Sequence, residues 1–391
     1  MRHHHHLLVL AFSLLASAPL RSADGIQLTT LFTAGSGGYA AYRIPVIAAT
    51  ADGTLLTVCE ARRDGIGDWA AIDLLLRRST DHGATWSAPV ILARAGDPGT
   101  ALAHNAVLIP GAGHAVHLLY CTGYNRCFHR RSDDDGATFA APVELTAAFT
   151  ALQQDFAWNV IATGPGHGLR LRGGRLVVPC WLSSGGHRHR PSVVTSLVSD
   201  DDGTTWRCGA ILPQTVLNPS ETVAVELADG TVQFNLRNEA PEHRRVVSRS
   251  PDGASGWSAL TPDPALLEPV CMAGLVRLDE GGGHGRIAFA NPDCLTWKDG
   301  KPGFARERRN LTIRLSADET RTWTQARVIE PGATGYCDLA AEPGGVVWCI
   351  YECGATAGNI YYTSELRVAR LTTSWIEAGQ RAPLLPEGEK P

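Results

Sequence analysis

Four arginines occur in sequence contexts that suggest binding of a substrate. They are Arg43 in YRIP, Arg62 in EARRD, Arg237 in FNLRN and Arg308 in RERRNL. A guanidinium is always charged and can bind a carboxylate through two parallel hydrogen bonds. A single surface arginine most often forms an exposed ion pair. Several arginines outside the repeated turns described below therefore predict an anionic substrate.

Asp68 lies in a loop together with Gly65, Gly67 and Trp69. An aromatic neighbour and the exclusion of water would raise the pKa of this carboxyl towards that of a general acid. An ordinary turn aspartate is the alternative interpretation, and the residues alone favour neither.

Two further residues, Glu221 and Tyr336, could carry chemistry. Glu221 precedes a predicted strand whose hairpin partner leads to Arg237, so closure of the hairpin would bring both residues to one end. Tyr336, in GYCD, enters a late strand, and the next strand ends at Glu352.

The elements that position these residues are marked by a turn that occurs five times. It combines Ser, Asp, Gly and an aromatic residue, at 79–86, 132–139, 199–206, 250–257 and 316–323, with Ala254 and Thr320 replacing the glycine in the last two copies. In such a turn the carboxylate accepts backbone N–H groups, glycine supplies a positive φ and the aromatic ring packs between strands. Because the aspartate recurs in every copy, we interpret these Asp-box turns as structural.

Short β-rich runs separated by Asp-Gly and Gly-rich turns fill the rest of the chain, as at 44–49, 54–58, 175–181, 193–198, 222–227, 231–236, 287–289, 311–315 and 346–351. Hardly any stretch has helical periodicity. An all-β chain with a repeat of fifty to seventy residues predicts a six-bladed β-propeller over residues 24–391, with no second domain. A sandwich or a solenoid is the alternative.

Composition and the N-terminus predict an exported, folded protein. A hydrophobic content of 44% with 19% charged residues is typical of a globular domain, and a net charge of −4 argues against a nucleic-acid partner. The apolar run 7–15 followed by Ala-Ser-Ala at 16–18 predicts a signal peptide over residues 1–23, or one cleaved after residue 18. We therefore expect a secreted or periplasmic protein whose mature chain has no transmembrane segment. No Cys/His spacing matches a zinc site.

The chain resembles the exo-α-sialidases (neuraminidases) of the bacterial and animal superfamily. The matching motifs occur in order over nearly the whole mature chain: YRIP, EAR with an acid six residues on, RRS with an Asp box, GPGHG, SETVAVELADG, RRNLTIRLS, and GYCDL with YE. One Asp box is a weak signal, but this ordered set is highly specific. The resemblance implies hydrolysis of terminal α-linked sialic acids on glycoproteins, glycolipids or oligosaccharides, with retention and without metal or cofactor.

The resemblance also implies the roles of individual residues. Asp68 would be the acid, Tyr336 the nucleophile and Glu221 its base. The substrate carboxylate would bind to an arginine triad, which consists of Arg43, Arg237 and Arg308.

Five other residues are expected around the substrate. Glu352 matches the acid that holds the first arginine, and Arg62 matches an arginine near the C4 substituent of the sugar. Trp181 stands where relatives often place an aromatic residue near the glycerol tail, and His104 with Asn105 occupies another loop at the rim.

Two of these positions and the activity itself have alternatives. Arg309 could replace Arg308, and Arg63 could replace Arg62. A non-catalytic sialic-acid-binding propeller would keep the arginines but would not need Asp68, Tyr336 and Glu221 together. A trans-sialidase or an intramolecular sialidase would use the same site and differ in its products.

Overall fold

The computed structural model describes residues 20–21, 26–96, 102–185, 187, 189–278, 285–295, 297–298, 301–302, 308–355 and 362–379. Within these residues the fold is all-β, as predicted, and the helices are the 3₁₀ helix η1 (Thr146–Gln153) and the short α1 (Thr373–Glu377). The predicted signal peptide, apart from 20–21, and the C-terminal segment 380–391 lie outside the described residues. No helix in the described part of the chain has the length and apolar character that a membrane crossing requires.

Four sheets follow one another along the chain, and their described strand pairs are antiparallel except for β12 with β7. The first contains β3 (Ala41–Ala49), β4 (Leu55–Arg62), β5 (Ile72–Ser79) and β6 (Val90–Ala93). The second contains β7 (Ala103–Pro110), β8 (Val116–Thr122), β9 (Arg126–Ser132), β10 (Val143–Glu144) and β12 (Gly166–His167). The third contains β11 (Val160–Thr163), β13 (Leu169–Arg170), β14 (Leu176–Ser183), β15 (Ser192–Ser199) and β16 (Arg207–Cys208). The fourth contains β17 (Thr222–Glu226), β18 (Val232–Leu236), β19 (Arg244–Ser250) and β20 (Thr261–Leu267).

The largest sheet joins the two ends of the chain. Its order is β1 (Leu20–Arg21), β2 (Gln27–Thr33), β28 (Glu365–Thr372), β27 (Val346–Cys353), β26 (Gln325–Glu342), β25 (Arg309–Ser316), β22 (Ile287–Pro292) and β21 (Gly274–Arg277). Strand β26 changes partner along its length, because residues 325–333 pair with β25 and residues 334–342 pair with β27. The sheet is therefore two four-stranded units that share one long strand, with β1 added at the edge. A separate ribbon consists of β23 (Trp297–Lys298) and β24 (Lys301–Pro302).

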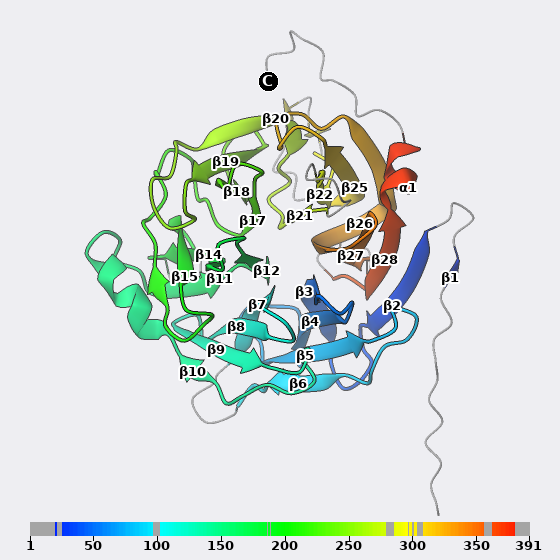
Figure 1. Ribbon diagram of the computed structural model, residues 1–391, viewed down its shortest axis with the longest axis horizontal. Coiled ribbons are helices and arrows are strands. Elements are labelled where there is room, and N and C mark those ends of the chain that lie inside the picture. The colour runs from blue at the N-terminus through cyan, green and yellow to red at the C-terminus, as the bar shows by residue number, and fades with distance from the viewer. Residues whose placement is uncertain are drawn as a thin grey trace, which may run out of the picture.

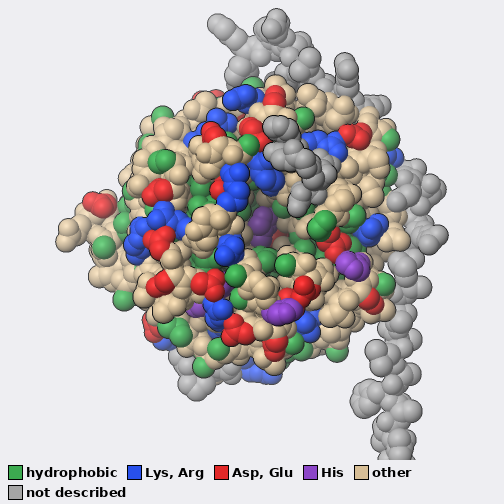
Figure 2. All heavy atoms as spheres, viewed as in Figure 1, with side chains coloured by type: hydrophobic (Ala, Val, Ile, Leu, Met, Phe, Trp, Pro, Cys, Tyr) green, Lys and Arg blue, Asp and Glu red, His purple; other side chains and the backbone are tan. Residues whose placement is uncertain are grey.

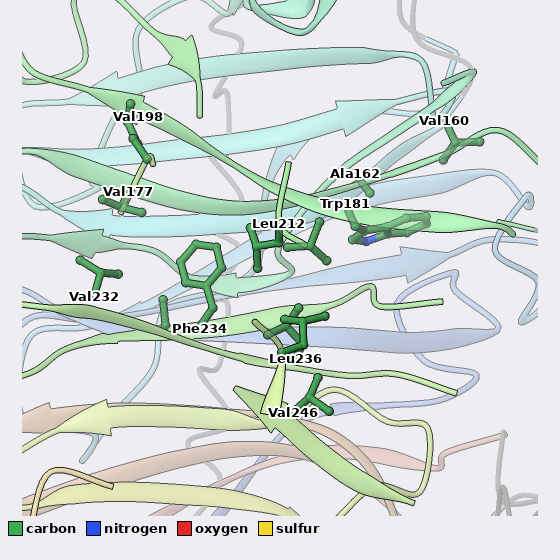
Figure 3. Close-up of a cluster of buried hydrophobic side chains, with 14 of the residues drawn as sticks. Val160, Ala162, Val177, Trp181, Val198, Leu212, Val232, Phe234, Leu236 and Val246 are labelled. Carbon is green, nitrogen blue, oxygen red and sulfur yellow. The ribbon is translucent and has the colours of Figure 1, made fainter. Parts of the chain in front are cut away.

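The sheets surround a common centre, with β3, β7, β12, β17 and β21 nearest to it and β6, β10 and β20 towards the outside (Figure 1). Each predicted strand overlaps an observed one. The buried apolar residues form clusters that combine side chains from neighbouring sheets, and Figure 3 shows the one that joins the third and fourth sheets. Because fully burying one large aliphatic side chain contributes about 1.5–3 kcal/mol, these clusters fix the strand ends that carry the polar residues discussed below.

The five repeated turns have a common hydrogen-bonding pattern. In the first, Asp81 accepts the backbone N–H of Thr85 at 2.9 Å and the Ser79 hydroxyl at 2.7 Å, and Ser79 Oγ accepts the Gly83 N–H at 2.8 Å. Equivalent aspartates accept a backbone N–H and a serine hydroxyl in the other turns, at Asp134, Asp201, Asp252 and Asp318. These aspartates are therefore occupied by their own turns.

The two turns that lack the expected glycine still contain a residue with positive φ, but at different positions. In the fourth turn Gly253 adopts the positive φ (+73°), one residue before Ala254. In the fifth turn Thr320 itself adopts φ +65°, and its N–H still donates to Ser316 Oγ at 2.9 Å. A β-branched residue with positive φ is unfavourable, so the surrounding hydrogen bonds must hold this turn.

Candidate active site

A cleft of about 210 Å³ brings together eight of the predicted site residues: Arg43, Asp68, Asn105, Trp181, Glu221, Arg237, Arg308 and Tyr336. They lie on strands, or in loops next to strands, of all the sheets described above except the β23–β24 ribbon. The space-filling view shows a hollow near the middle of the ring with basic side chains on parts of its rim (Figure 2). Residues far apart in the sequence therefore meet at one polar cavity.

Tyr336, Glu221 and Arg237 form one hydrogen-bonded group in the cleft. The Tyr336 hydroxyl donates to Glu221 Oε1 at 2.6 Å and accepts from Arg237 Nη1 at 2.6 Å, while Arg237 also forms an ion pair with Glu221. The predicted hairpin closure is confirmed, since β17 pairs with β18 and the Arg237 N–H donates to the Glu221 carbonyl at 2.9 Å. Burial raises the pKa of Tyr336 although Arg237 opposes the shift. The phenol therefore stays protonated until a base removes its proton.

Arg43 and Arg308 lie on the ring of the same tyrosine. Their guanidinium carbons are 5.4 and 5.2 Å from the centroid of Tyr336. Arg308 is buried, lines the cleft and donates to the carbonyl of Val270 at 2.7 Å, whereas Arg309 is exposed at the start of β25. The geometry places Arg308, and not its neighbour, beside Arg43 and Arg237.

Glu352 holds Arg43 from behind. This fully buried carboxylate accepts from Arg43 Nε and Nη2, both at 3.2 Å, and from the backbone N–H groups of Ile44 at 2.9 Å and Tyr336 at 3.1 Å. The pairing of β3 with β4 shifts register between Arg43 and Val46, and Ile44 has φ +54°. A β-branched residue in this region is strained, and bulges often redirect side chains at functional sites. The glutamate thus stabilises the bend that aims Arg43 into the cleft.

Asp68 lies in the loop between β4 and β5, and its side chain is half exposed (50%). Partial loss of hydration raises its pKa, but the nearby charges of Arg62, at 3.0 Å, and Arg43 outweigh this effect, so the pKa of Asp68 is lowered. The expectation of a raised pKa at Asp68 was therefore wrong. It considered the aromatic neighbour and not the two arginines.

Arg62 and Arg63 have different surroundings. Arg62 is fully buried behind Asp68, where it also binds Glu60 Oε2 at 2.7 Å and the carbonyl of Ile66. It does not line the cleft, and its side chain contacts the Asp68 carboxylate. Arg63 binds Asp73 at 2.8 Å. Of the two arginines, Arg62 therefore contacts a residue that lines the cleft, whereas Arg63 contacts Asp73, which does not line it.

Asn105 and Trp181 line the cleft, but His104 does not. His104 is fully buried behind Asn105, with Nδ1 at 2.8 Å from Asn105 Oδ1 and Nε2 at 3.1 Å from the backbone nitrogen of Tyr124. Its predicted place at the rim is corrected by this burial. Glu352 and Arg62 are likewise behind the cleft surface.

Sequence reasoning missed three neighbours of these residues. Glu60 is buried and accepts from both Arg62 and the backbone N–H of Asn105, at 3.0 Å. Its spacing of two from Arg62 on one strand, which puts both on one face, was a usable signal. Tyr124 and His189 line the cleft from loops, and no local pattern distinguishes them from other loop residues.

Comparison with known proteins adds the following findings. A family model described as "BNR repeat-like domain" matches residues 70–349. The chain is 28% identical over 372 residues to "Sialidase" of Micromonospora viridifaciens, which covers 88% of this chain and 53% of that protein. It is 26% identical over 465 residues to human "Sialidase-4", which covers 90% of this chain and 94% of that protein. The chain thus spans about half the length of the bacterial relative.

Solved structures share the fold. The "Hadza microbial sialidase Hz136" superposes with a TM-score of 0.72 at 23% identity, covering 88% of this chain and 68% of that one. The intramolecular trans-sialidase from Ruminococcus gnavus, in complex with oseltamivir carboxylate, superposes with a TM-score of 0.72 at 16% identity, covering 89% of this chain and 98% of that one. At these identities the likeness concerns the fold alone.

Proposed function

Because the chain belongs to the exo-α-sialidase family of BNR-repeat proteins, we propose that it is a retaining exo-α-sialidase that hydrolyses terminal α-linked sialic acids. We further propose that its sheets are the six blades of a propeller. The first four sheets would be one blade each, and the eight-stranded sheet would be two, divided within β26. The predicted signal peptide would bring this domain to the extracytoplasmic side, where sialylated glycoconjugates occur.

The contact of the Tyr336 hydroxyl with Glu221 carries the proposal. In sialic acid the carbon under attack bears a carboxylate. A carboxylate nucleophile at about 4 Å would be repelled by roughly 4 kcal/mol at an effective dielectric of 20, which is about three decades in rate. A neutral phenol avoids this repulsion, and sialidases are the glycosidases that use a tyrosine.

Activation of the phenol follows from its two partners. As Tyr336 Oη attacks the anomeric carbon, Glu221 Oε1 takes the hydroxyl proton over the 2.6 Å contact, and Arg237 Nη1 stabilises the charge that develops on the oxygen. The bond to the leaving oxygen breaks, and a tyrosyl-linked sugar remains. Water later attacks the anomeric carbon from the face that the leaving group vacated, opposite the tyrosyl oxygen, and the bond to Tyr336 breaks; the two inversions together give retention.

Asp68 is the group that would protonate the leaving oxygen. Its pKa is lowered, because Arg62 and Arg43 favour the carboxylate. A bound substrate carboxylate would offset the charge of Arg43 and so raise the pKa of Asp68. Binding of the substrate would therefore favour the protonated acid, which then returns as the base that activates water.

The three arginines beside Tyr336 would bind the substrate carboxylate. Arg43, Arg237 and Arg308 all lie within reach of the tyrosine ring or hydroxyl. A carboxylate held there positions the anomeric carbon over the nucleophile and stabilises a flattened, cationic sugar ring.

The experiment compares leaving groups. The aryl group of an aryl α-sialoside departs without a proton, whereas the sugar leaving group of sialyl-lactose must be protonated as it departs. Asp68→Ala should lose about 10²–10⁴-fold in kcat/KM on sialyl-lactose and much less on the aryl substrate, while Asp64→Ala, four residues earlier in the loop, should behave like the parent. Equal losses on both substrates would contradict the acid role. Proton NMR of the first product identifies its anomer and separates hydrolysis from intramolecular transfer.

A further inference from the structure

A buried ion pair between Arg245 and Glu268 lies behind the cleft and has no assigned task in the proposed reaction. The two side chains are 0% and 1% exposed, and Arg245 Nη1 lies 2.8 Å from Glu268 Oε2. Neither residue lines the cleft, so neither contacts a substrate bound in it. Removing two charges from water is unfavourable, and a buried ion pair is therefore weak evidence of stabilisation. The geometry that the pair imposes on its neighbours is the better guide to its role.

An irregularity in the backbone turns Arg245 inward. The pairing of β19 with β20 shifts register between Arg244 and Val246, so Arg245 falls at a bulge, and bulges redirect side chains. Its guanidinium then binds β18, because Nε donates to Asn235 Oδ1 at 2.7 Å and Nη2 donates to the Asn235 carbonyl at 2.9 Å. Arg245 thus ties the end of β18 to Glu268.

The same ion pair holds the backbone on both sides of Arg237. Asn235, which binds the guanidinium of the pair, lies two positions before Arg237. One position after it, the backbone N–H of Asn238 donates to Glu268 Oε2 at 3.3 Å. The chain is therefore fixed before and after the arginine whose Nη1 donates to the Tyr336 hydroxyl.

The other oxygen of Glu268 holds the segment that contacts Arg308. Glu268 Oε1 accepts the backbone N–H of Cys271 at 3.0 Å. The preceding residue, Val270, lines the cleft and has φ +56°, which is strained for a β-branched residue. Its carbonyl accepts from Arg308 Nη2 at 2.7 Å. The carboxylate therefore holds the strained turn that presents this carbonyl to Arg308.

Two other buried carboxylates near the cleft make the same combination of contacts. Each binds an arginine and the backbone N–H of a residue with φ +54°: Glu352 binds Arg43 and Ile44, and Glu60 binds Arg62 and Asn105. At Glu268 the residue with positive φ is Val270, directly before the one whose N–H is bound. Glu268 thus has the contacts of a support, and its own arginine is turned away from the cleft.

We propose that the Arg245–Glu268 pair positions two of the cleft arginines for the C1 carboxylate of a sialic acid. Glu268 is the positioning residue, and it acts through Arg237 and Arg308 without touching the substrate. This inference rests on the proposed function, because it takes the ligand of these arginines to be the carboxylate of a sialic acid. A displacement of a binding group by about 1 Å can reduce a rate by about 10²-fold.

Glu268→Gln is the first test. Glutamine keeps the shape of the side chain but offers one oxygen and one NH₂ group to three donors, so at least one donor would face another donor. With an aryl α-sialoside, KM should rise, kcat should fall and kcat/KM should fall by about 10²-fold. A role in folding alone would reduce the amount of active protein, which lowers the apparent kcat and leaves KM unchanged. The control Glu342→Gln should keep the KM of the parent, and a parent-like KM in Glu268→Gln would overturn the proposal.

A binding measurement is independent of turnover. The probes are an α-thiosialoside, whose sulfur link resists hydrolysis, and the methyl ester of its C1 carboxylate, and calorimetry gives a Kd for each. The parent should bind the acid roughly 10–100-fold more tightly than the ester, as expected for hydrogen bonds to a charged group. Glu268→Gln should bring this ratio close to one, whereas Glu342→Gln should preserve it. An unchanged ratio in Glu268→Gln would refute the positioning role.

Two further variants test the path of the effect and guard against a failure to fold. In an Arg308→Ala background, Glu268→Gln should change the acid-to-ester ratio by a smaller factor than in the parent, because the two residues act together; an equal factor would contradict action through Arg308. If Glu268→Gln does not fold, Arg245→Lys replaces it, since lysine keeps the charge but not the fork that reaches Asn235. A parent-like KM and ratio in Arg245→Lys would then overturn the proposal.

The ratio also separates this inference from the proposed function. If the parent hydrolyses no sialoside but binds the acid more tightly than the ester, the proposed hydrolase fails, and loss of the ratio in Glu268→Gln still supports the positioning role. If the parent binds the acid no better than the ester, its arginines do not recognise the carboxylate, and both proposals are wrong.

Discussion

Replacing Glu352 by glutamine tests how the cleft is supported. Four donors converge on this carboxylate: Arg43 Nε and Nη2, and the backbone N–H groups of Ile44 and Tyr336. Glutamine offers one oxygen and one NH₂ group, so at least one donor would face another donor. Arg43 would also lose its buried partner.

The expected loss of stability follows from these contacts. Removing one partner of a buried ion pair typically costs about 3–5 kcal/mol. Burial raises the pKa of Glu352, but the charge of Arg43 outweighs this effect, so the pKa is lowered. The contribution of Glu352 to the free energy of unfolding is therefore present above the unfolded-state pKa of about 4.3 and is lost as the pH falls through the folded-state pKa. Glu352→Gln should therefore remove this contribution to the fall in the free energy of unfolding at acid pH.

Urea unfolding at neutral pH, followed by tryptophan fluorescence, measures the effect. The matched control is Glu342→Gln. Glu342 is also buried, but its partners are Trp348 Nε1 and His82 Nδ1, both at 2.7 Å, and an imidazole nitrogen can accept from the new NH₂ group. We expect a loss below about 1 kcal/mol for this control. A loss of that small size for Glu352→Gln would refute the reasoning.

Three further predictions concern a turn, a histidine and the acid. Gly136→Ala should lower the free energy of unfolding in urea by about 1 kcal/mol more than Gly230→Ala. Both glycines have a positive φ, but the new Cβ at Gly136 would lie 2.8 Å from Leu56 Cδ2 of β4, whereas the new Cβ at Gly230 would meet open space. Equal losses of stability would contradict this prediction. Burial lowers the pKa of His167, but the ion pair with Asp338, at 2.7 Å, has the larger effect and raises it above the ordinary value. This ion pair therefore stabilises the fold fully below about pH 6.5, and its contribution is lost as the pH rises through the folded-state pKa of His167. The measurement is the free energy of unfolding of the parent and of His167→Gln as a function of pH. If the two free energies change in parallel as the pH rises above about 6.5, the pair does not titrate. The alkaline limb set by Asp68 should lie at higher pH in single-turnover rates at saturating substrate than in kcat/KM, and coincident limbs would contradict the effect of the substrate carboxylate.

Much of the scaffold was predictable because its signals are local. The alternating strands and the Asp-Gly turns each depend on a few consecutive residues, and the hairpin that joins Glu221 to Arg237 follows from them. The pairing of β2 with the last strand, β28, depends on residues more than three hundred positions apart. No periodicity in either strand contains that information.

The candidate site was predictable in its residue types and less so in its contacts. Arg308 and Arg309 are adjacent, so a shift of one residue in the start of β25 decides which one faces the cleft. The pKa of Asp68 depends on the path of an irregular loop, which brings its carboxyl to Arg62. His104 and Asn105 were both expected at the rim of the site, but only Asn105 lines the cleft. His104 is buried behind it and contacts its side-chain oxygen.

The identity of the nucleophile is the central claim, and covalent trapping tests it most directly. A 3-fluorosialosyl fluoride needs no acid to lose fluoride, and its electron-withdrawing 3-fluorine slows hydrolysis of the intermediate. After rapid quenching and proteolysis, mass spectrometry should find the added fluorosialosyl mass on the peptide that contains Tyr336, and none in Tyr336→Phe. Label on Glu221, or unchanged sialoside turnover by Tyr336→Phe, would contradict the mechanism.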